Sequence, residues 1–247
     1  MRFASRLFLS LAATAALAAT PALAAPAKNV VLVHGAFADG SGWAAVAKIL
    51  KRDGYNVSIV QPPETSLEDD VAATKRVLDA QDGPTVLVGH SYGGIIITGA
   101  GDNANVKSLV YVAAFQPDTG ESLASLGQKT PAASQAIRPT KDGFLVLDQG
   151  LFHGDFCADL PADEADLMAR SQVPLSVKSA TAPAGDPAWK HKPSFAVVAT
   201  QDRAINPDLE RFMYKRSGAT TIELQSSHVV YMSKPAEVAA LIEKAAQ

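Results

Sequence analysis

Thr85-Val86-Leu87-Val88-Gly89-His90-Ser91-Tyr92-Gly93-Gly94 is the stretch that decides the fold. Its first four residues are apolar or β-branched, as expected for a buried strand, and the helix-forming residues 95–101 follow it. G-x-S-x-G between a strand and a helix predicts a sharp turn that exposes the serine hydroxyl, a nucleophile elbow. Ser91 is therefore the candidate nucleophile. The alternative is a tight turn whose serine only caps the helix.

The rest of the chain alternates between short apolar runs and amphipathic segments. This alternation, with short connections, predicts an α/β fold with a doubly wound, mostly parallel sheet of about six strands. Besides the strand of the elbow, we expect strands over residues 29–33, 56–60, 107–113, 195–199 and 220–224, and helices over residues 43–52, 66–80, 95–101, 208–216 and 235–246.

Residues 116–192 interrupt the alternation after the fourth strand. They contain several prolines, little strand signal and one clear helix, residues 162–170. The segment is too long for a simple loop and follows a strand end, the side where α/β sheets bind ligands. We therefore predict a lid over 116–192, inserted into a single core formed by residues 25–115 and 193–247.

The first 24 residues have the pattern of a secretory signal peptide. Arg2 and Arg6 flank the charged region, residues 7–19 are apolar, and an A-x-A site ends at Ala24. The apolar run is too short and too rich in alanine for a stable membrane anchor. We expect export to a bacterial periplasm or secretion, with cleavage near Ala24.

Charge and cysteine content exclude several functions. The net charge is −3 at pH 7, or −5 without Arg2 and Arg6, which gives no support to nucleic-acid binding. Cys157 is the only cysteine, so it forms no intrachain disulfide, and we expect a buried small hydrophobe rather than a catalytic thiol. Neither metal-ligand spacing nor a phosphate-binding loop is present, so we expect no metal and no cofactor.

A serine nucleophile needs a base and an orienting acid, here in the chain order Ser, acid, His. His228 follows the last strand and is the candidate base, whereas His153 and His191 belong to the lid or its edge. Asp202 follows the strand 195–199 and is the candidate acid. Asp208 is the alternative, but after a proline it looks like an early helical residue.

An acyl-transfer site also needs N–H donors for the oxyanion. Tyr92, directly after the nucleophile, supplies one. Ala36, in the loop after the first strand, supplies the other, with Phe37 as the second choice. We expect His34 and His90 to buttress these loops rather than to take part in the chemistry.

With these residues in place, the chain resembles the α/β-hydrolase family, in particular its compact branch of plant methylesterases, hydroxynitrile lyases and related bacterial esterases. The resemblance covers residue 29 to the C-terminus except the lid, and it rests on residues 31–36, 89–93, 202–207, 227–228 and 233–235. It implies the α/β-hydrolase fold, the triad Ser91, His228 and Asp202, and Ala36 and Tyr92 as oxyanion donors. The lid matches no family closely enough to indicate a substrate.

The leading hypothesis is a serine hydrolase that cleaves a small or medium carboxylic ester through an acyl-enzyme. The alternatives are a lyase or perhydrolase on the same scaffold, and a ligand-binding receptor with a hydrolase fold. In the similar lyases a lysine follows the catalytic histidine and a threonine stands at the position of Gly35; here Val229 and glycine favour the esterase. Candidates for lining the pocket, or alternatively for packing the lid onto the core, are Phe37, Phe144, Phe152, Phe156, Met168 and Trp189.

Overall fold

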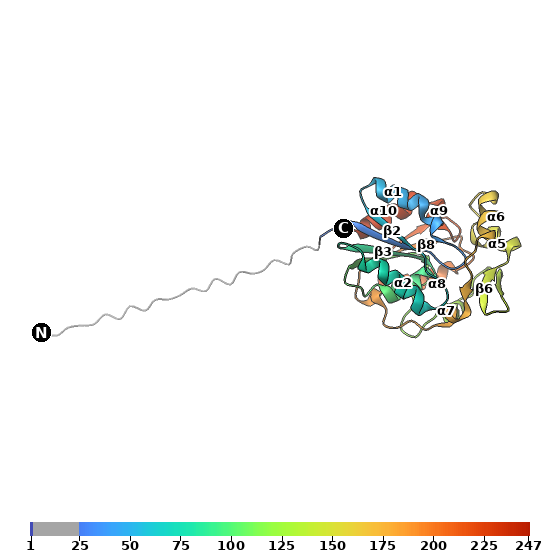
Figure 1. The fold of residues 1–247 in the computed structure, drawn as a ribbon, viewed down its shortest axis with the longest axis horizontal. Helices are drawn as coiled ribbons and strands as arrows, with labels where there is room; N and C mark the ends of the chain where they lie inside the picture. The colour runs from blue at the N-terminus through green and yellow to red at the C-terminus, as the bar shows by residue number, and fades with distance from the viewer. Residues whose placement is uncertain (2–24) are drawn as a thin grey trace.

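The computed structural model describes residue 1 and residues 25–247 (Figure 1). The predicted signal peptide lies outside the described residues apart from Met1, so export stays a prediction. The central sheet has six strands in the order β2-β1-β3-β4-β8-β9, and all neighbours are parallel, as predicted. These strands are β1 (Asn29–Val33), β2 (Asn56–Val60), β3 (Thr85–Ser91), β4 (Val106–Ala114), β8 (Ser194–Ala199) and β9 (Thr220–Leu224).

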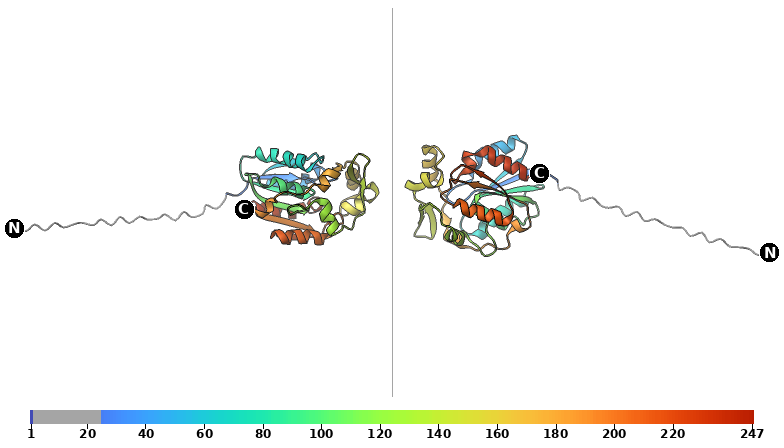
Figure 2. Two further views of the ribbon diagram at one scale, coloured as in Figure 1. Left: turned by 90° about the horizontal axis from the view of Figure 1, so that it is seen from below. Right: turned by 180° about the vertical axis from the view of Figure 1, so that it is seen from behind.

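Helices cover both faces of this sheet (Figures 1 and 2). One face carries α1 (Ala44–Arg52) and α10 (Pro235–Ala245), and the other carries α2 (Leu67–Asp79), α3 (Gly93–Ala100) and α8 (Pro207–Ser217). Every residue of β1 and of β3 is therefore buried, which explains why these strands read as unbroken apolar runs. Short helices η1 (Gly40–Trp43) and α9 (Val230–Ser233) complete the core. Among the described residues, no helix has both the length and the apolar character needed to span a bilayer.

Residues 116–192, here called the lid segment, contain more structure than the sequence indicates. The predicted helix is present as α6 (Ala162–Arg170). A three-stranded antiparallel sheet was not predicted, because its strands are only two to four residues long and too short to show a period. The elements of the segment are α4 (Leu123–Lys129), β5 (Ile137–Pro139), β6 (Phe144–Leu147), α5 (Gln149–Phe156), α6, β7 (Leu175–Ser176), α7 (Val177–Thr181) and η2 (Ala188–Lys190).

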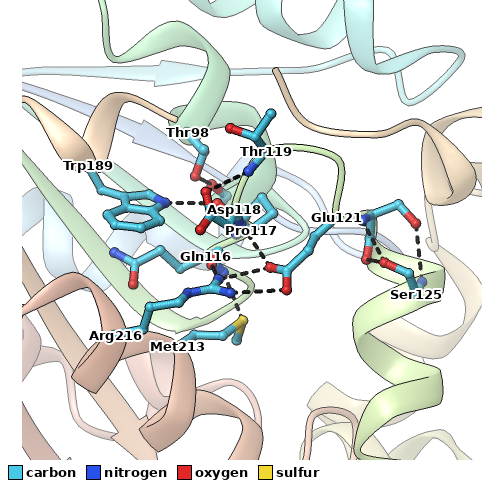
Figure 3. A network of polar contacts seen from close by, with 12 residues as sticks. Thr98, Gln116, Pro117, Asp118, Thr119, Glu121, Ser125, Trp189, Met213 and Arg216 are labelled. Atoms are coloured by element: carbon cyan, nitrogen blue, oxygen red, sulfur yellow. Dashed lines mark hydrogen bonds and ion pairs between the residues drawn. The ribbon is translucent and has the colours of Figure 1, made fainter. Parts of the chain in front are cut away.

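The two ends of the lid segment are fastened to each other and to α8 (Figure 3). The indole N–H of Trp189, near the end of the segment, donates to the carbonyl oxygen of Pro117 at its start (2.8 Å). Arg216 of α8 pairs with Glu121 (2.9 Å) and donates to the carbonyl oxygen of Gln116 (2.8 Å). These contacts fix the base of the segment on the core. The remainder of the segment extends beyond the carboxyl ends of the core strands, where α5, α6 and β6 lie (Figure 1).

Candidate active site

Ser91 occupies the turn between β3 and α3 in a strained conformation. Its φ is +52°, in a region that a residue with a side chain rarely adopts. The neighbouring glycines permit this turn, because a Cβ on Gly89 would lie 2.5 Å from the carbonyl oxygen of Gly93, and one on Gly93 would lie 2.6 Å from that of His34. The amide of Phe115 donates to the carbonyl oxygen of Ser91 (3.1 Å) and fixes the turn against the end of β4.

His228 and Asp202 form a buried pair. The Nδ1 atom of His228 lies 2.5 Å from Oδ2 of Asp202. The other carboxylate oxygen accepts the backbone N–H groups of Ala204 (2.7 Å) and Ile205 (2.9 Å), which fixes the orientation of the carboxylate. Among the described residues, Nε2 of His228 has no hydrogen-bond partner. The imidazole is thus held at one nitrogen while the other stays available, and His228 lines the same pocket as Ser91.

The alternative candidates lie elsewhere. Asp208 is at the start of α8, its side chain is 80% exposed, and it pairs with Arg211 (2.8 Å). His153 lies within hydrogen-bond distance of the carbonyl oxygen of Leu160 (3.0 Å), and the side chain of His191 is 66% exposed. Within residues 25–247, no three His, Cys, Asp or Glu side chains are arranged to hold a metal ion.

The predicted oxyanion donors lie on two loops, Ala36 after β1 and Tyr92 after β3. Ala36 lines the pocket of Ser91. Phe37, with a φ of +65°, donates its N–H to the carbonyl oxygen of Val173 (3.1 Å), so this amide is already engaged. Tyr92 is anchored through its side chain, whose hydroxyl donates to Asp70 (2.6 Å). The contact with Val173 therefore leaves Ala36 as the better donor of the two in this loop.

Two further histidines support these loops. Nε2 of His90 lies 3.0 Å from the carbonyl oxygen of His228, and Nδ1 of His34 lies 3.0 Å from that of Gly35. Both side chains are buried, and desolvation lowers the pKa of His34 and lowers that of His90 further. Both rings are therefore neutral near pH 7. Their contacts agree with the buttressing role that we expected for them.

The pocket next to Ser91 and His228 has a volume of about 70 Å³ and a largely apolar lining. Two of the six predicted residues, Phe37 and Phe156, line it, and the ring of Phe156 lies 4.9 Å from that of His228. Met168 instead lines a neighbouring pocket of about 40 Å³, which Phe37 also borders. Most of the apolar lining was not predicted: Phe115, Leu123, Ile137, Leu145, Leu147, Leu175 and Ile205.

The other three predicted pocket residues do not line this cavity. Phe152 is fully buried and stacks against Phe156 at 4.9 Å, so it supports the wall rather than forming it. Trp189 is bound at the base of the lid segment. Phe144 alternates along β6 with Leu145, whose side chain lines the pocket, and therefore points to the other face of the strand. Residues 144–147 are apolar throughout, so the sequence carried no signal for which face of this strand lines the pocket.

Two aspartates of the lid segment, both missed in the sequence, fasten the loops that carry Asp202 and His228. Asp155 accepts a hydrogen bond from Arg203, the residue after Asp202 (2.8 Å). Asp159 accepts from the hydroxyl of Ser226 (2.7 Å) and from the amide of Ser227 (3.0 Å), and it also contacts the Ser227 hydroxyl. The connection between α5 and α6 is therefore a fixed part of the site.

The sequence also matches a known protein family. The model of the α/β hydrolase family matches residues 30–241, and the chain belongs to this family. The chain is 25% identical over 244 residues to a pyrethroid hydrolase from Sphingobium wenxiniae, covering 87% of this chain and 86% of that protein. It is 35% identical over 114 residues to a carbendazim hydrolyzing esterase from Nocardioides sp., a match that spans 40% of this chain and only 46% of that protein.

Solved structures agree with this assignment of the fold. The crystal structure of polyneuridine aldehyde esterase superimposes with a TM-score of 0.76 at 17% sequence identity, and the match covers 90% of this chain and 100% of that one. The protein is thus an α/β hydrolase with relatives that are named esterases and hydrolases, as its resemblance to the compact branch of this family predicted.

Asp159→Ala tests the fixed connection between α5 and α6. Loss of charge-assisted hydrogen bonds should lower the free energy of unfolding by about 1–3 kcal/mol and speed amide exchange at Ser227. Burial would raise the pKa of Asp159, but the hydrogen bonds from Ser227 and Ser226 outweigh it and lower this pKa. The stabilisation is therefore present above the pKa of the unfolded chain and is lost as the pH falls through the lower folded value.

Asp166→Ala is the matched control, because Asp166 is also in the lid segment but makes only an exposed pair with Arg170. It should change the free energy of unfolding by less than about 0.5 kcal/mol. Equal effects of the two substitutions, or unchanged exchange at Ser227 in Asp159→Ala, would contradict the tethering role.

Proposed function

We propose that the protein is a serine hydrolase that cleaves a small or medium carboxylic ester through an acyl-enzyme. Ser91 is the nucleophile, His228 the general base and Asp202 the orienting acid. The observation that carries this proposal is the buried contact between His228 and Asp202, with Nε2 of the imidazole left available beside the pocket of Ser91. A carboxylate at Nδ1 selects the tautomer that accepts a proton at Nε2.

The reaction would proceed in two halves. Ser91 Oγ attacks the ester carbonyl carbon while its proton passes to Nε2 of His228, and the N–H groups of Ala36 and Tyr92 stabilise the oxyanion. The intermediate collapses, the C–O bond to the alcohol breaks, and the alcohol leaves with the proton from His228. Water then attacks the acyl group with His228 again as base, which releases the acid and restores Ser91.

The pocket supports an uncharged, compact group on the substrate. A volume of about 70 Å³ is small for a ligand pocket, for which roughly 300–1,000 Å³ is typical. The described residues that line the pocket include no Lys or Arg, and its one acid, Asp155, is paired with Arg203, so a charged acyl group would find no lysine or arginine partner there. The names of the pyrethroid hydrolase and the carbendazim hydrolyzing esterase support hydrolysis as the reaction class.

Steric and electrostatic features favour an ester over a cyanohydrin. A Cβ on Gly35 would lie 2.6 Å from Cβ of Ser91, so the threonine of the similar lyases does not fit this backbone. Val229 is fully buried and offers no charge. The two lysines near the end of the lid segment are engaged elsewhere, Lys190 with an aspartate (2.6 Å) and Lys192 with a backbone carbonyl (2.8 Å). These observations support acyl transfer rather than cyanide release.

Ser91→Ala tests the proposed nucleophile. Hydrolysis of an aryl acetate should fall by about 10⁴-fold or more with the fold retained, because the smaller side chain fits wherever serine did. In the unsubstituted protein, a serine-reactive phosphonate should add to Ser91, as located by peptide mass spectrometry. Retained turnover in the variant, or labelling of another residue, would contradict the proposal. Saturable binding of the ester without turnover would instead support a receptor, and release of cyanide from mandelonitrile without ester turnover would support a lyase.

Asp202→Asn tests the orienting acid, with Asp208→Asn as the matched control on the next helix. An amide at position 202 favours the wrong tautomer of His228, so kcat should fall by as much as about 10⁴-fold. Asp208 lies on the surface, and its replacement should change kcat by less than about twofold. Steady-state kinetics on the aryl acetate measure both effects. A reversed order of the two effects would show that the acid is misassigned.

A further inference from the structure

Glu210, on the inner face of α8, is a fully buried acid next to the proposed triad. Its Oε2 atom accepts the backbone N–H of Ala199 (3.2 Å). Its Oε1 atom is buried and, within the part of the chain that the structure describes, has no hydrogen-bond donor. An ionised carboxylate with one oxygen unpartnered in the core would carry a large desolvation cost. This arrangement suits a carboxyl group that carries a proton.

Within residues 25–247, no Lys, Arg or His forms an ion pair with Glu210. Asp202 is the neighbouring acid: its amide donates to the carbonyl oxygen of Ala199 (3.1 Å), the residue whose N–H Glu210 accepts. Arg211 is turned outward to Glu223 (2.7 Å). The hydroxyl of Tyr214 is bonded to the backbone of residue 114 (2.8 Å).

Two neighbouring carboxylates in a buried site cannot both be charged at low cost. The carboxylate of Asp202 faces three potential donors, two backbone N–H groups and the imidazole. Glu210 has one such donor, Ala199 N–H. Burial, and next the charge of Asp202, raise the pKa of Glu210 well above its ordinary value. The shared proton therefore resides on Glu210.

We propose that Glu210 is a positioning residue that, as a neutral acid, donates its O–H to the carboxylate of Asp202 and extends the arrangement Ser91–His228–Asp202 by a fourth member. The proposal rests on the proposed function, because it assigns Glu210 a role through Asp202. The O–H of Glu210 restricts rotation of the Asp202 side chain. It thereby keeps one carboxylate oxygen of Asp202 facing Nδ1 of His228. No covalent bond changes, and the proton stays on Glu210 throughout.

Two substitutions separate this role from simple packing. Glu210→Gln places an NH₂ donor where the O–H stands and keeps an oxygen for the N–H of Ala199, so it mimics the neutral acid. Glu210→Leu has a similar volume but offers neither group. If Glu210 were instead ionised, Glu210→Gln would remove a negative charge close to His228. The base would then lose a proton more easily, and the acid limb of kcat/KM would move to lower pH.

The kinetic experiment measures kcat, KM and the pH profile of aryl acetate hydrolysis for both variants. We expect Glu210→Gln to retain at least about half of kcat with an unmoved acid limb. Glu210→Leu should lose kcat by about tenfold at unchanged KM, the effect of one hydrogen bond. An acid limb shifted to lower pH in Glu210→Gln, or full kcat in Glu210→Leu, would overturn the proposal.

A stability experiment tests the protonation of Glu210 without any activity, so it distinguishes failure of this proposal from failure of the proposed function. The pKa of Glu210 is higher in the folded protein than in the unfolded chain. Above about pH 4.5 the folded protein therefore binds more protons at this position than the unfolded chain does. The contribution of Glu210 to the free energy of unfolding consequently falls as the pH rises. Glu210→Gln does not titrate at this position and should therefore gain stability relative to the unsubstituted protein as the pH rises.

The control is Glu223→Gln, because the hydrogen bond from Arg211 lowers the pKa of Glu223. The Glu223 carboxylate stabilises the folded protein above its unfolded pKa, so its contribution to the free energy of unfolding has the opposite sign to that of Glu210. Glu223→Gln should therefore lose stability relative to the unsubstituted protein as the pH rises. Urea unfolding at several pH values gives both slopes and remains informative if Glu210→Leu does not fold. The relevant quantity is the free energy of unfolding of Glu210→Gln minus that of the unsubstituted protein. If this difference does not change with pH, or falls with rising pH as in the control, the proposal is overturned.

Discussion

The contact between His228 and Asp202 is the interaction on which the site depends, and the sheet creates it. Strands β8 and β9 are adjacent and parallel, with Ala199 paired to Leu224. Asp202 and His228 follow these paired residues by three and four positions, so the register of two strands brings the proposed acid and the proposed base together. Ser91 reaches the same edge at the end of β3. The geometry of the site is therefore set by strand register rather than by the conformation of one loop.

Around this contact, the protein replaces water with fixed neutral or paired groups. His34 and His90 are uncharged through burial, Asp155 and Asp159 of the lid segment hold the neighbouring loops, and Glu210 lies behind Asp202. Such an environment strengthens the few hydrogen bonds aimed at a reacting group. The lid segment contributes to this shell as well as to the pocket.

The features that could be predicted from the sequence are those set by a local pattern of residues. Buried runs such as residues 29–33 and 85–88 identified the core strands, and the position of Asp202 just beyond a strand distinguished it from Asp208 at the start of a helix. The strands of the lid segment, Asp155, Asp159 and Glu210 were not predicted, because their roles arise from contacts between residues distant in the chain. Glu210 is three residues past a proline on an amphipathic helix, where nothing local separates a buried acid from a solvated one. Trp189 was a reasonable choice for an aromatic wall, but its indole is bound at the base of the segment.

A crystal structure of the protein with an aryl phosphonate bound covalently would test the central claim most directly, because the tetrahedral phosphorus resembles the intermediate of acyl transfer. The account predicts phosphorus on Ser91 Oγ, with one phosphoryl oxygen about 2.7–3.1 Å from the amide nitrogens of both Ala36 and Tyr92. It also predicts that His228 Nε2 faces Ser91 while Nδ1 keeps its contact with Asp202. A phosphoryl oxygen bound instead by the amide of Phe37, or an adduct on another residue, would contradict it.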